Sequence, residues 1–410
     1  MGKRILVLGT GAQGSTVAMR MDEIPEVDEI ICADYSKEAA DELVKILTKG
    51  RSAQVNAKDK DHIVEIAQGV DLIVNALPLE YGKNVIEAAL EVKAGYQDFA
   101  APEHIVPSDD WIEGIEYMLT EYNERFKAIG KTAIMGTGSA PGLICVATRR
   151  AVRELDRCDT IYNLVYEGVE SKRFIPYWWS PITALSDMSE DAYAFENGKQ
   201  IRTTPFSLPL KRTYDYVGYE TTFVEHAHDE PVYMGINSER YFKGAQNIYF
   251  KYSGVGIDYA RPLYRSGLLS HNPEPTPDGG SIIPFDLVLK HTPPAPKYAS
   301  EIKSIIDEGL VSDTGAMVVE AYGKKDGKDV RVEVHVFAPG LVESFEKAGI
   351  SSEMYITGQG GAMFTKMHVL DKYVKNGLFS SDMLEDEEVD YYFEMAAELD
   401  ITLDIRVIEI

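Results

Sequence analysis

The feature that most constrains the fold is a short glycine-rich turn near the N-terminus, Gly9-Thr10-Gly11-Ala12-Gln13-Gly14. It follows a continuous apolar run, Lys3 to Leu8, of the kind that forms a buried strand in a parallel sheet. It also opens a predicted helix, Gly14 to Met21. A strand, a glycine turn and a helix in this order predict the first strand–helix unit of an open α/β sheet.

Each position of the turn has a physical role in binding a dinucleotide. Gly9 permits the tight turn, Gly11 lets the backbone approach a pyrophosphate, and Gly14 allows close contact of helix and strand. Ala12 and Gln13 lie at the helix start, whose free N–H groups attract phosphate. Asp34 ends a second predicted strand, Glu29 to Ala33, and is expected to accept hydrogen bonds from the adenine-side ribose, with Tyr35 beside it. A carboxylate there favours NAD, while the nearby Lys37 leaves NADP open.

Strand and helix signals alternate through about residue 140, which predicts right-handed crossovers and a doubly wound parallel sheet. A fourth strand, Asp71 to Ala76, is stopped by Pro78, and we expect Ala76, Leu77 and Pro78 to lie near the nicotinamide-side ribose. A fifth strand carries Tyr96 and Asp98, either of which could position substrate or serve as a catalytic group. Asp98 could instead cap the next loop.

The remaining chain is predicted to form a second domain and a C-terminal segment that packs back on the first domain. Aromatic and β-branched segments from Thr160 onward, with helices between them, predict an α+β domain with a mixed sheet. Asn272 to Pro284, which holds four prolines and two adjacent glycines, is predicted to be a loop. We therefore expect a cofactor domain over residues 1–140, a substrate and dimerisation domain over 141–360, and a segment 361–410 that packs back on the first domain.

Several side chains of the middle region are candidates for handling an amine or amino acid. Arg173 could clamp a carboxylate through its planar guanidinium, or it could be a solvated surface charge. Trp179 suits a cationic amine. The run Glu225-His226-Ala227-His228-Asp229-Glu230 is rich in titratable groups, and we favour His228 or Glu230 as an acid or base over a metal site. A hydrogen-bonded structural histidine is the alternative.

In order along the chain, several blocks resemble the saccharopine dehydrogenase-like family, which includes saccharopine reductases, lysine 6-dehydrogenases and carboxynorspermidine-type dehydrogenases. They are the glycine turn with Asp34, Asn75 to Pro78, Ala140-Pro141-Gly142-Leu143, Trp179-Ser180-Pro181, Gly267-Leu268-Leu269, and Thr357-Gly358. The resemblance implies hydride transfer at a carbon–nitrogen bond with NAD(P). It also implies that Pro141 and Gly142 lie at the cofactor, that Trp179 and Ser180 line the pocket, and that the protein is a homodimer. Ala140 departs from the acidic residue of many members, which puts the substrate in doubt.

The composition of the chain limits its possible partners and its cellular location. A net charge of −25, from 41 basic and 66 acidic side chains, disfavours nucleic acid as a partner. No apolar stretch is long enough to span a membrane, and three scattered cysteines indicate a reducing cytoplasm. The sequence thus predicts a cytoplasmic NAD(P)-dependent oxidoreductase acting on the CH–NH group of an amino acid or polyamine-like amine. A deaminating lysine 6-dehydrogenase type and a non-catalytic NAD(H)-binding redox sensor are the alternatives.

Overall fold

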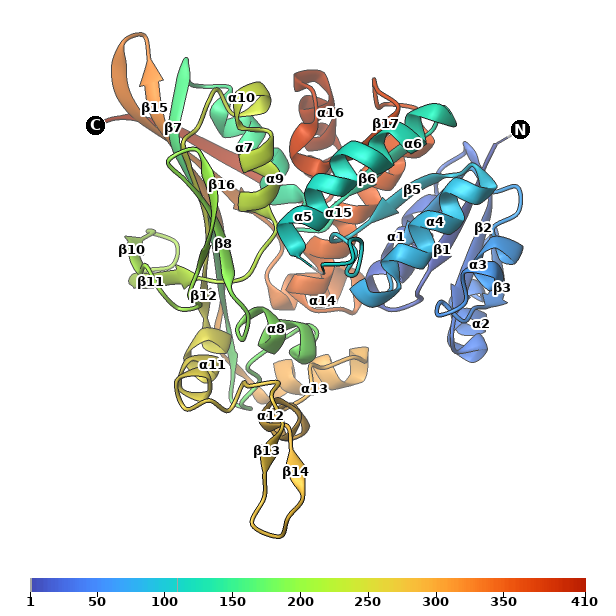
Figure 1. The fold of residues 1–410 in the computed structure, drawn as a ribbon, viewed down its shortest axis with the longest axis horizontal. Helices are drawn as coiled ribbons and strands as arrows, with labels where there is room; N and C mark the ends of the chain where they lie inside the picture. The colour runs from blue at the N-terminus through green and yellow to red at the C-terminus, as the bar shows by residue number, and fades with distance from the viewer. Residues whose placement is uncertain (1, 109) are drawn as a thin grey trace. The chain divides into compact units, whose positions relative to one another are not determined.

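The protein folds into two compact units in the computed structural model, which describes residues 2–108 and 110–410 (Figure 1). The first unit contains Met1–Arg150 and Ile356–Leu399, and the second contains Ala151–Tyr355 and Asp400–Ile410. The sequence had led us to expect boundaries after residues 140 and 360. The difference arises because the helix after residue 142 and the helix before residue 370 each run across a boundary, which local sequence signals do not mark.

A seven-stranded parallel sheet forms the centre of the first unit, in the order β17-β6-β5-β4-β1-β2-β3. Its strands are β1 (Lys3–Leu8), β2 (Val27–Asp34), β3 (Gly50–Gln54), β4 (Leu72–Asn75), β5 (Gly95–Asp98), β6 (Thr132–Met135) and β17 (Gly377–Ser380). Ile5 to Leu8 are fully buried, as expected of a strand covered on both faces. The strand order reverses between β1 and β4, and open α/β sheets bind ligands at such a switch point.

Helices cover both faces of this sheet (Figure 1). They are α1 (Ala12–Asp22), α2 (Lys37–Val44), α3 (Lys60–Ile66), α4 (Gly82–Val92), α5 (Trp111–Tyr117), α6 (Asn123–Ala128), α7 (Leu143–Val152), α15 (Ser352–Val369) and α16 (Asp386–Ala397). Helix α15 packs closely against α1 because glycine lies at the contact between the two helices. A Cβ at Gly358 would lie 2.8 Å from Oγ1 of Thr16 in α1. The doubly wound cofactor fold predicted from the sequence is confirmed.

The second unit is built on a nine-stranded mixed sheet, with the main order β10-β11-β12-β7-β15-β16-β18, in which β8 also pairs with β12 and β9 pairs with β8. Its strands are β7 (Arg157–Ser171), β8 (Ala192–Glu196), β9 (Lys199–Thr203), β10 (Leu210–Thr213), β11 (Glu220–Glu225), β12 (Asn247–Gly254), β15 (Leu310–Lys325), β16 (Lys328–Phe337) and β18 (Thr402–Glu409). Strands β7 and β12 run parallel, and the other pairs are antiparallel. The expected mixed sheet is therefore present.

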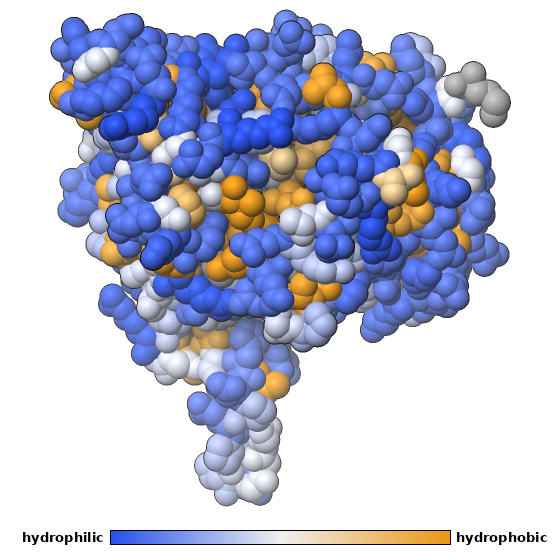
Figure 2. All heavy atoms as spheres, turned by 45° about the horizontal axis from the view of Figure 1, so that its top comes forward, coloured by the Kyte–Doolittle hydropathy of each residue, from blue (hydrophilic) through white to orange (hydrophobic). Residues whose placement is uncertain are grey.

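Short helices and one hairpin complete the second unit. The helices are α8 (Pro181–Asp187), α9 (Glu230–Ile236), α10 (Ser238–Tyr241), α11 (Val255–Arg265), α12 (Pro284–His291), α13 (Ala299–Glu308) and α14 (Leu341–Ala348). Strands β13 (Glu274–Pro275) and β14 (Ser281–Ile282) pair within the segment predicted to be a loop, and this hairpin projects from the unit (Figures 1 and 2). Hydrophilic side chains cover most of the face in Figure 2, in keeping with the high content of charged residues.

The C-terminal segment divides between the units, whereas we expected all of residues 361–410 to return to the cofactor domain. Strand β17 joins the edge of the parallel sheet beside β6, but β18 pairs antiparallel with β16 of the second unit. Alternation of apolar and polar residues identifies a strand without identifying the sheet edge that it completes. Among the described residues, no helix is long and apolar enough to cross a bilayer.

Candidate active site

The glycine turn of the first unit has the geometry of a phosphate-binding loop. Gly9 has φ of +89°, and a Cβ there would lie 2.6 Å from the carbonyl oxygen of Ala76 at the end of β4. A Cβ at Gly14 would lie 1.9 Å from the carbonyl oxygen of Gly9, so this contact requires glycine. By contrast, apart from Gly11 and its two chain neighbours, no heavy atom of the described residues lies within 4 Å of a Cβ at Gly11, which leaves open space beside the backbone.

That open space lies at the start of α1. Gly11 is the N-cap, and the helix begins at Ala12, followed by Gln13. The first N–H groups of a helix have no intrahelical partners and carry a partial positive charge. The residues present therefore fit a dinucleotide pyrophosphate, which Gly11, Ala12 and Gln13 would hold.

Asp34, at the end of β2, stabilises the glycine turn through hydrogen bonds. Its Oδ2 accepts hydrogen bonds from the backbone N and Oγ1 of Thr10 at 2.8 and 3.0 Å, and its Oδ1 accepts one from the backbone N of Ser36 at 2.9 Å. Tyr35, next to it, is 76% exposed. Asp34 is thus at the expected position beside the turn. Its ribose role and that of Tyr35 stay predictions.

The segment after β4 also lies at this edge of the sheet. Oδ1 of Asn75 accepts a hydrogen bond from the backbone N of Leu77 at 3.2 Å, and Pro78 precedes the short helix Leu79–Tyr81. The carbonyl oxygen of Ala76 lies beside Gly9, 2.6 Å from the place that a Cβ of that residue would occupy. Ala76 and Leu77 are therefore next to the glycine turn, and Pro78 follows them directly in the chain. Contact of these three residues with the cofactor stays a prediction.

The Pro141-Gly142 loop is buried in the first unit. Gly142 has φ of +132°, and a Cβ there would lie 2.0 Å from the carbonyl oxygen of Gly138. This close loop leads directly into α7, and Oγ of Ser139 lies 2.9 Å from Oγ1 of Thr357 in α15. The geometry explains the need for glycine, while contact with the cofactor stays a prediction.

Tyr96 and Asp98 are held inside the first unit. Both are almost fully buried; the hydroxyl of Tyr96 donates to Oδ2 of Asp98 at 2.8 Å, and the backbone N of Gly136 donates to Oδ1 at 2.8 Å. Burial, with the charge of Asp98, raises the pKa of Tyr96 well above its usual range. The bond from Gly136 joins β5 to the loop after β6, and the bond from Tyr96 lies within β5. A catalytic role of either residue stays a prediction.

In the second unit, His228 and Glu230 form a carboxylate–imidazole pair. Oε2 of Glu230 lies 2.8 Å from Nδ1 of His228, and the imidazole stacks on Phe250 of β12, with ring centroids 3.8 Å apart and an interplanar angle of 8°. Glu230 is fully buried, whereas the His228 side chain keeps 14% exposure. The carboxylate and the aromatic ring fix the imidazole plane and leave Nε2 as the nitrogen that can face a ligand.

Acidic groups surround this pair. Burial alone would lower the pKa of His228, but Glu230, Asp187 and Asp229 outweigh it and raise the pKa. Burial raises the pKa of Asp187 to about 8, with His228 opposing the rise. His226, stacked on Tyr252, is held neutral because burial and the charge of His228 lower its pKa well below the usual value.

Two further carboxyl groups, Glu167 and Glu353, lie in this region, and sequence reasoning missed both. Burial raises the pKa of Glu167, with Glu353 adding to the rise, while Tyr252, Trp179 and His228 oppose it. Burial likewise raises the pKa of Glu353. The one available signal was a glutamate followed by glycine after the run Leu164-Val165-Tyr166 in β7. We call Glu167, Asp187, His226, His228, Glu230 and Glu353 the histidine–carboxylate cluster.

The other predicted substrate residues have different surroundings. Trp179 lies beside Glu167, as its effect on that carboxyl shows. Ser180 caps α8, accepting a hydrogen bond from Oγ1 of Thr183 at 2.9 Å. Nε of Arg173 donates to Oε2 of Glu308 at 2.6 Å, so the chain itself supplies the carboxylate that we expected from a substrate. The roles of Ser180 and Arg173 stay predictions.

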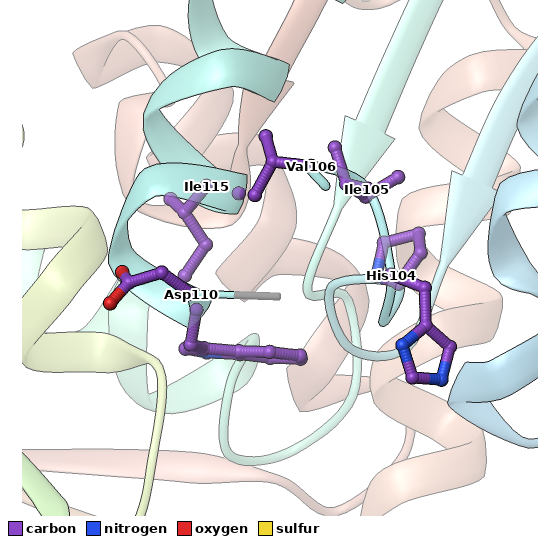
Figure 3. Close-up of a pocket in the computed structure, with 8 residues that line it drawn as sticks. His104, Ile105, Val106, Asp110 and Ile115 are labelled. Carbon is purple, nitrogen blue, oxygen red and sulfur yellow. The ribbon is translucent and has the colours of Figure 1, made fainter. Parts of the chain in front are cut away.

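Two other kinds of site are not supported. A hollow after β5 measures only about 10 Å³, room for about one water molecule (Figure 3). Figure 3 shows Ile105, Val106 and Ile115 grouped around it, and Asp110 uses its carboxylate to cap α5. Within residues 2–108 and 110–410, no group of three or more His, Cys, Asp or Glu side chains is arranged to hold a metal ion.

Comparison with known proteins agrees with this geometry. Residues 5–134 match the saccharopine dehydrogenase NADP-binding domain. The chain is 27% identical to the carboxynorspermidine synthase of Vibrio alginolyticus, over 93% of this chain and 92% of that protein. It is 24% identical to the carboxyaminopropylagmatine dehydrogenase of Synechocystis, over 93% of both chains. The L-Glu-forming saccharopine dehydrogenase of Saccharomyces cerevisiae shares the fold, with a TM-score of 0.69 at 14% identity over 99% of this chain and 100% of that one.

The doubly wound unit with its matched NADP-binding domain identifies an NAD(P)-dependent oxidoreductase. Residues 5–134 are thus a saccharopine dehydrogenase NADP-binding domain, and over nearly its whole length the chain is similar to the two relatives named above. The resemblance noted in the sequence is thereby confirmed.

Proposed function

We propose that the protein reduces the imine formed between a cationic amine and a carbonyl compound, producing a secondary amine. The observation that carries the proposal is the His228–Glu230 pair, in which Glu230 is buried, inside a cluster with the half-buried carboxyl groups of Glu167, Asp187 and Glu353. Such surroundings attract a positively charged amine, and they provide a proton donor at the same place. The polyamine-related names of the two relatives support an amine of this type.

NAD(P)H, when bound, supplies a hydride for the imine carbon, and the residues of this chain supply orientation and the proton. His228 holds a proton because its neighbouring carboxylates raise its pKa. Glu230 fixes Nδ1, so Nε2 donates the proton to the substrate nitrogen. The C=N bond thus becomes CH–NH, with one hydride and one proton taken up.

The test is NAD(P)H oxidation by the full chain, followed by absorbance, with an amine and a short aldehyde supplied singly and together. The proposal expects absorbance to fall only when both are present. Reduction of NAD(P)+ by an amine alone, with release of ammonia, would instead identify an oxidative deaminase. Tight cofactor binding without turnover across a broad amine panel would identify a redox sensor.

We also propose a cofactor preference, a cellular location and an oligomeric state for the enzyme. Asp34 supports NAD over NADP, because a carboxylate repels the 2′-phosphate of NADP. Three buried, free cysteines support a cytoplasmic location, and the net charge of −25 disfavours nucleic acid. A homodimer formed through the second sheet is supported by two exposed apolar side chains, Phe337 on β16 and Val407 on β18. Size-exclusion chromatography with light scattering, which measures the mass of the protein in solution, tests the dimer.

A further inference from the structure

We propose that the first unit holds a second ligand site, at the edge of its parallel sheet opposite the glycine turn, which binds a small anion and takes up a proton at His368. The ligand would carry a phosphate or carboxylate group. The inference does not depend on the proposed reaction, because every residue that it uses lies in the cofactor unit. It rests on a polar cavity and on the charged side chains that line it.

The cavity has a volume of about 260 Å³, close to the ~300 Å³ at which small-molecule sites begin. It lies at the amino ends of several strands: Lys3 begins β1, Leu72 begins β4, Thr132 begins β6 and Asn376 precedes β17. The glycine turn follows the other end of β1. At ~3.3 Å per residue, Lys3 and Gly9 are about 20 Å apart along the strand, so one phosphate group cannot occupy both sites.

The charged groups along this cavity leave one cation without a partner. Nζ of Lys3 lies 3.0 Å from Oδ1 of Asp371, and Oδ2 of Asp71 accepts a hydrogen bond from the backbone N of Arg4 at 2.8 Å. Lys131, by contrast, has no ion pair or side-chain hydrogen bond within the part of the chain that the structure describes, although it is half-buried. A half-buried ammonium group at a polar cavity attracts an anion, and phosphate or carboxylate oxygens accept its hydrogen bonds.

His368, in the last turn of α15, adds a second nitrogen group to the cavity. Gly95 at the start of β5 makes room for the imidazole, since a Cβ there would lie 2.4 Å from Nε2. Nδ1 is buried and has no hydrogen-bond partner among residues 2–108 and 110–410. Buried polar atoms normally have a partner, so Nδ1 indicates a place where a ligand or water completes the bonding.

The surroundings of His368 link its protonation to an anion. Burial is the main cause that lowers its pKa to about 4; Lys3 and Lys131 act in the same direction, and the two aspartates of the cavity oppose them. Tyr373, whose ring lies edge-on to the imidazole at 5.9 Å, stays neutral because burial raises its pKa well above the usual value. The imidazole is therefore neutral near pH 7. A negative charge beside it favours the imidazolium, so anion and proton bind together.

The experiment measures sulfate binding to the full chain by titration calorimetry, with NAD(P)H in excess to occupy the glycine turn. Sulfate is the probe because its own charge does not change near neutral pH. We expect proton uptake, seen as a binding heat that depends on the buffer, and a Kd that rises with pH by up to about tenfold per unit. Succinate and methyl phosphate, compared at one pH, then distinguish a carboxylate from a phosphate ligand.

Three variants identify the residues. Lys131→Gln should raise the Kd for sulfate about 10- to 100-fold, the effect of one lost charge-assisted hydrogen bond. His368→Asn should weaken binding and abolish the proton uptake. Lys58→Gln, at an exposed lysine of the same unit outside the cavity, is the matched control and should change neither quantity.

Three results would overturn the site: equal sulfate binding by wild type and Lys131→Gln, a Kd that does not vary with pH, or no binding while NAD(P)H is present. The last result would place the sulfate at the glycine turn. If His368→Asn fails to fold, as judged by circular dichroism, the pH dependence of the wild type and the Kd of Lys131→Gln decide.

Discussion

Two alanine substitutions in the glycine turn should have opposite effects on stability and on binding. Gly11→Ala adds a methyl group where no described heavy atom lies within 4 Å, so the fold should be nearly unaffected. The same methyl group occupies the space that the pyrophosphate needs. Gly14→Ala places Cβ 1.9 Å from the carbonyl oxygen of Gly9, which forces strand and helix apart.

The magnitudes follow from these contacts. Loss of one N–H···phosphate hydrogen bond costs about 1.5–3 kcal/mol, so the Kd for NAD(P)H should rise about 10- to 100-fold in Gly11→Ala. Overpacking costs about 1–3 kcal/mol, which for a unit of this size lowers Tm by about 2–12 °C in Gly14→Ala. Titration of nicotinamide fluorescence measures Kd, and calorimetric melting measures Tm. Undiminished cofactor affinity in Gly11→Ala would show that the pyrophosphate binds elsewhere.

Three other substitutions test individual side chains. Asp34→Ser should raise the Kd for NAD more than that for NADP; equal changes would count against a ribose role. His228→Asn should lower kcat about 10²- to 10⁴-fold, the usual contribution of a general acid, and a near-normal kcat would remove His228 from the mechanism. Glu230→Gln removes a charge that raises the pKa of His228, so the imidazolium loses its proton at lower pH and the alkaline limb of the rate profile moves to lower pH. An unmoved limb would mean that another group donates the proton.

The sequence predicted the cofactor unit well because its signals are local. The apolar run of β1, the glycine turn and Asp34 lie close together along the chain, and each has one favoured geometry. Helix α15 was harder to predict, since it begins at Ser352 and so runs across the boundary that we expected after residue 360. The three glycines of α15 allow close contacts with segments that are distant in sequence. Helical periodicity does not reveal such contacts.

The substrate unit was less predictable for the same reason. His228 and Glu230 were identified because they are close in sequence. Glu167 was missed because its environment comes from Gly254 and Gly315, which lie on two other strands and become its neighbours only through sheet register. Arg173 looked free in sequence, yet it pairs with Glu308 from α13.

The division of the chain between the two units has a consequence for synthesis on the ribosome. The parallel sheet lacks its edge strand β17 until residues 377–380 have emerged, and β16 stays an open edge until residues 402–409 emerge. A nascent chain of 370 residues therefore exposes β6 and β16 as sheet edges, although both are paired in the complete chain, and exposed edges are sites for pairing with other chains. We expect such a chain to depend on chaperones, and no single cut in this sequence separates it into two complete domains.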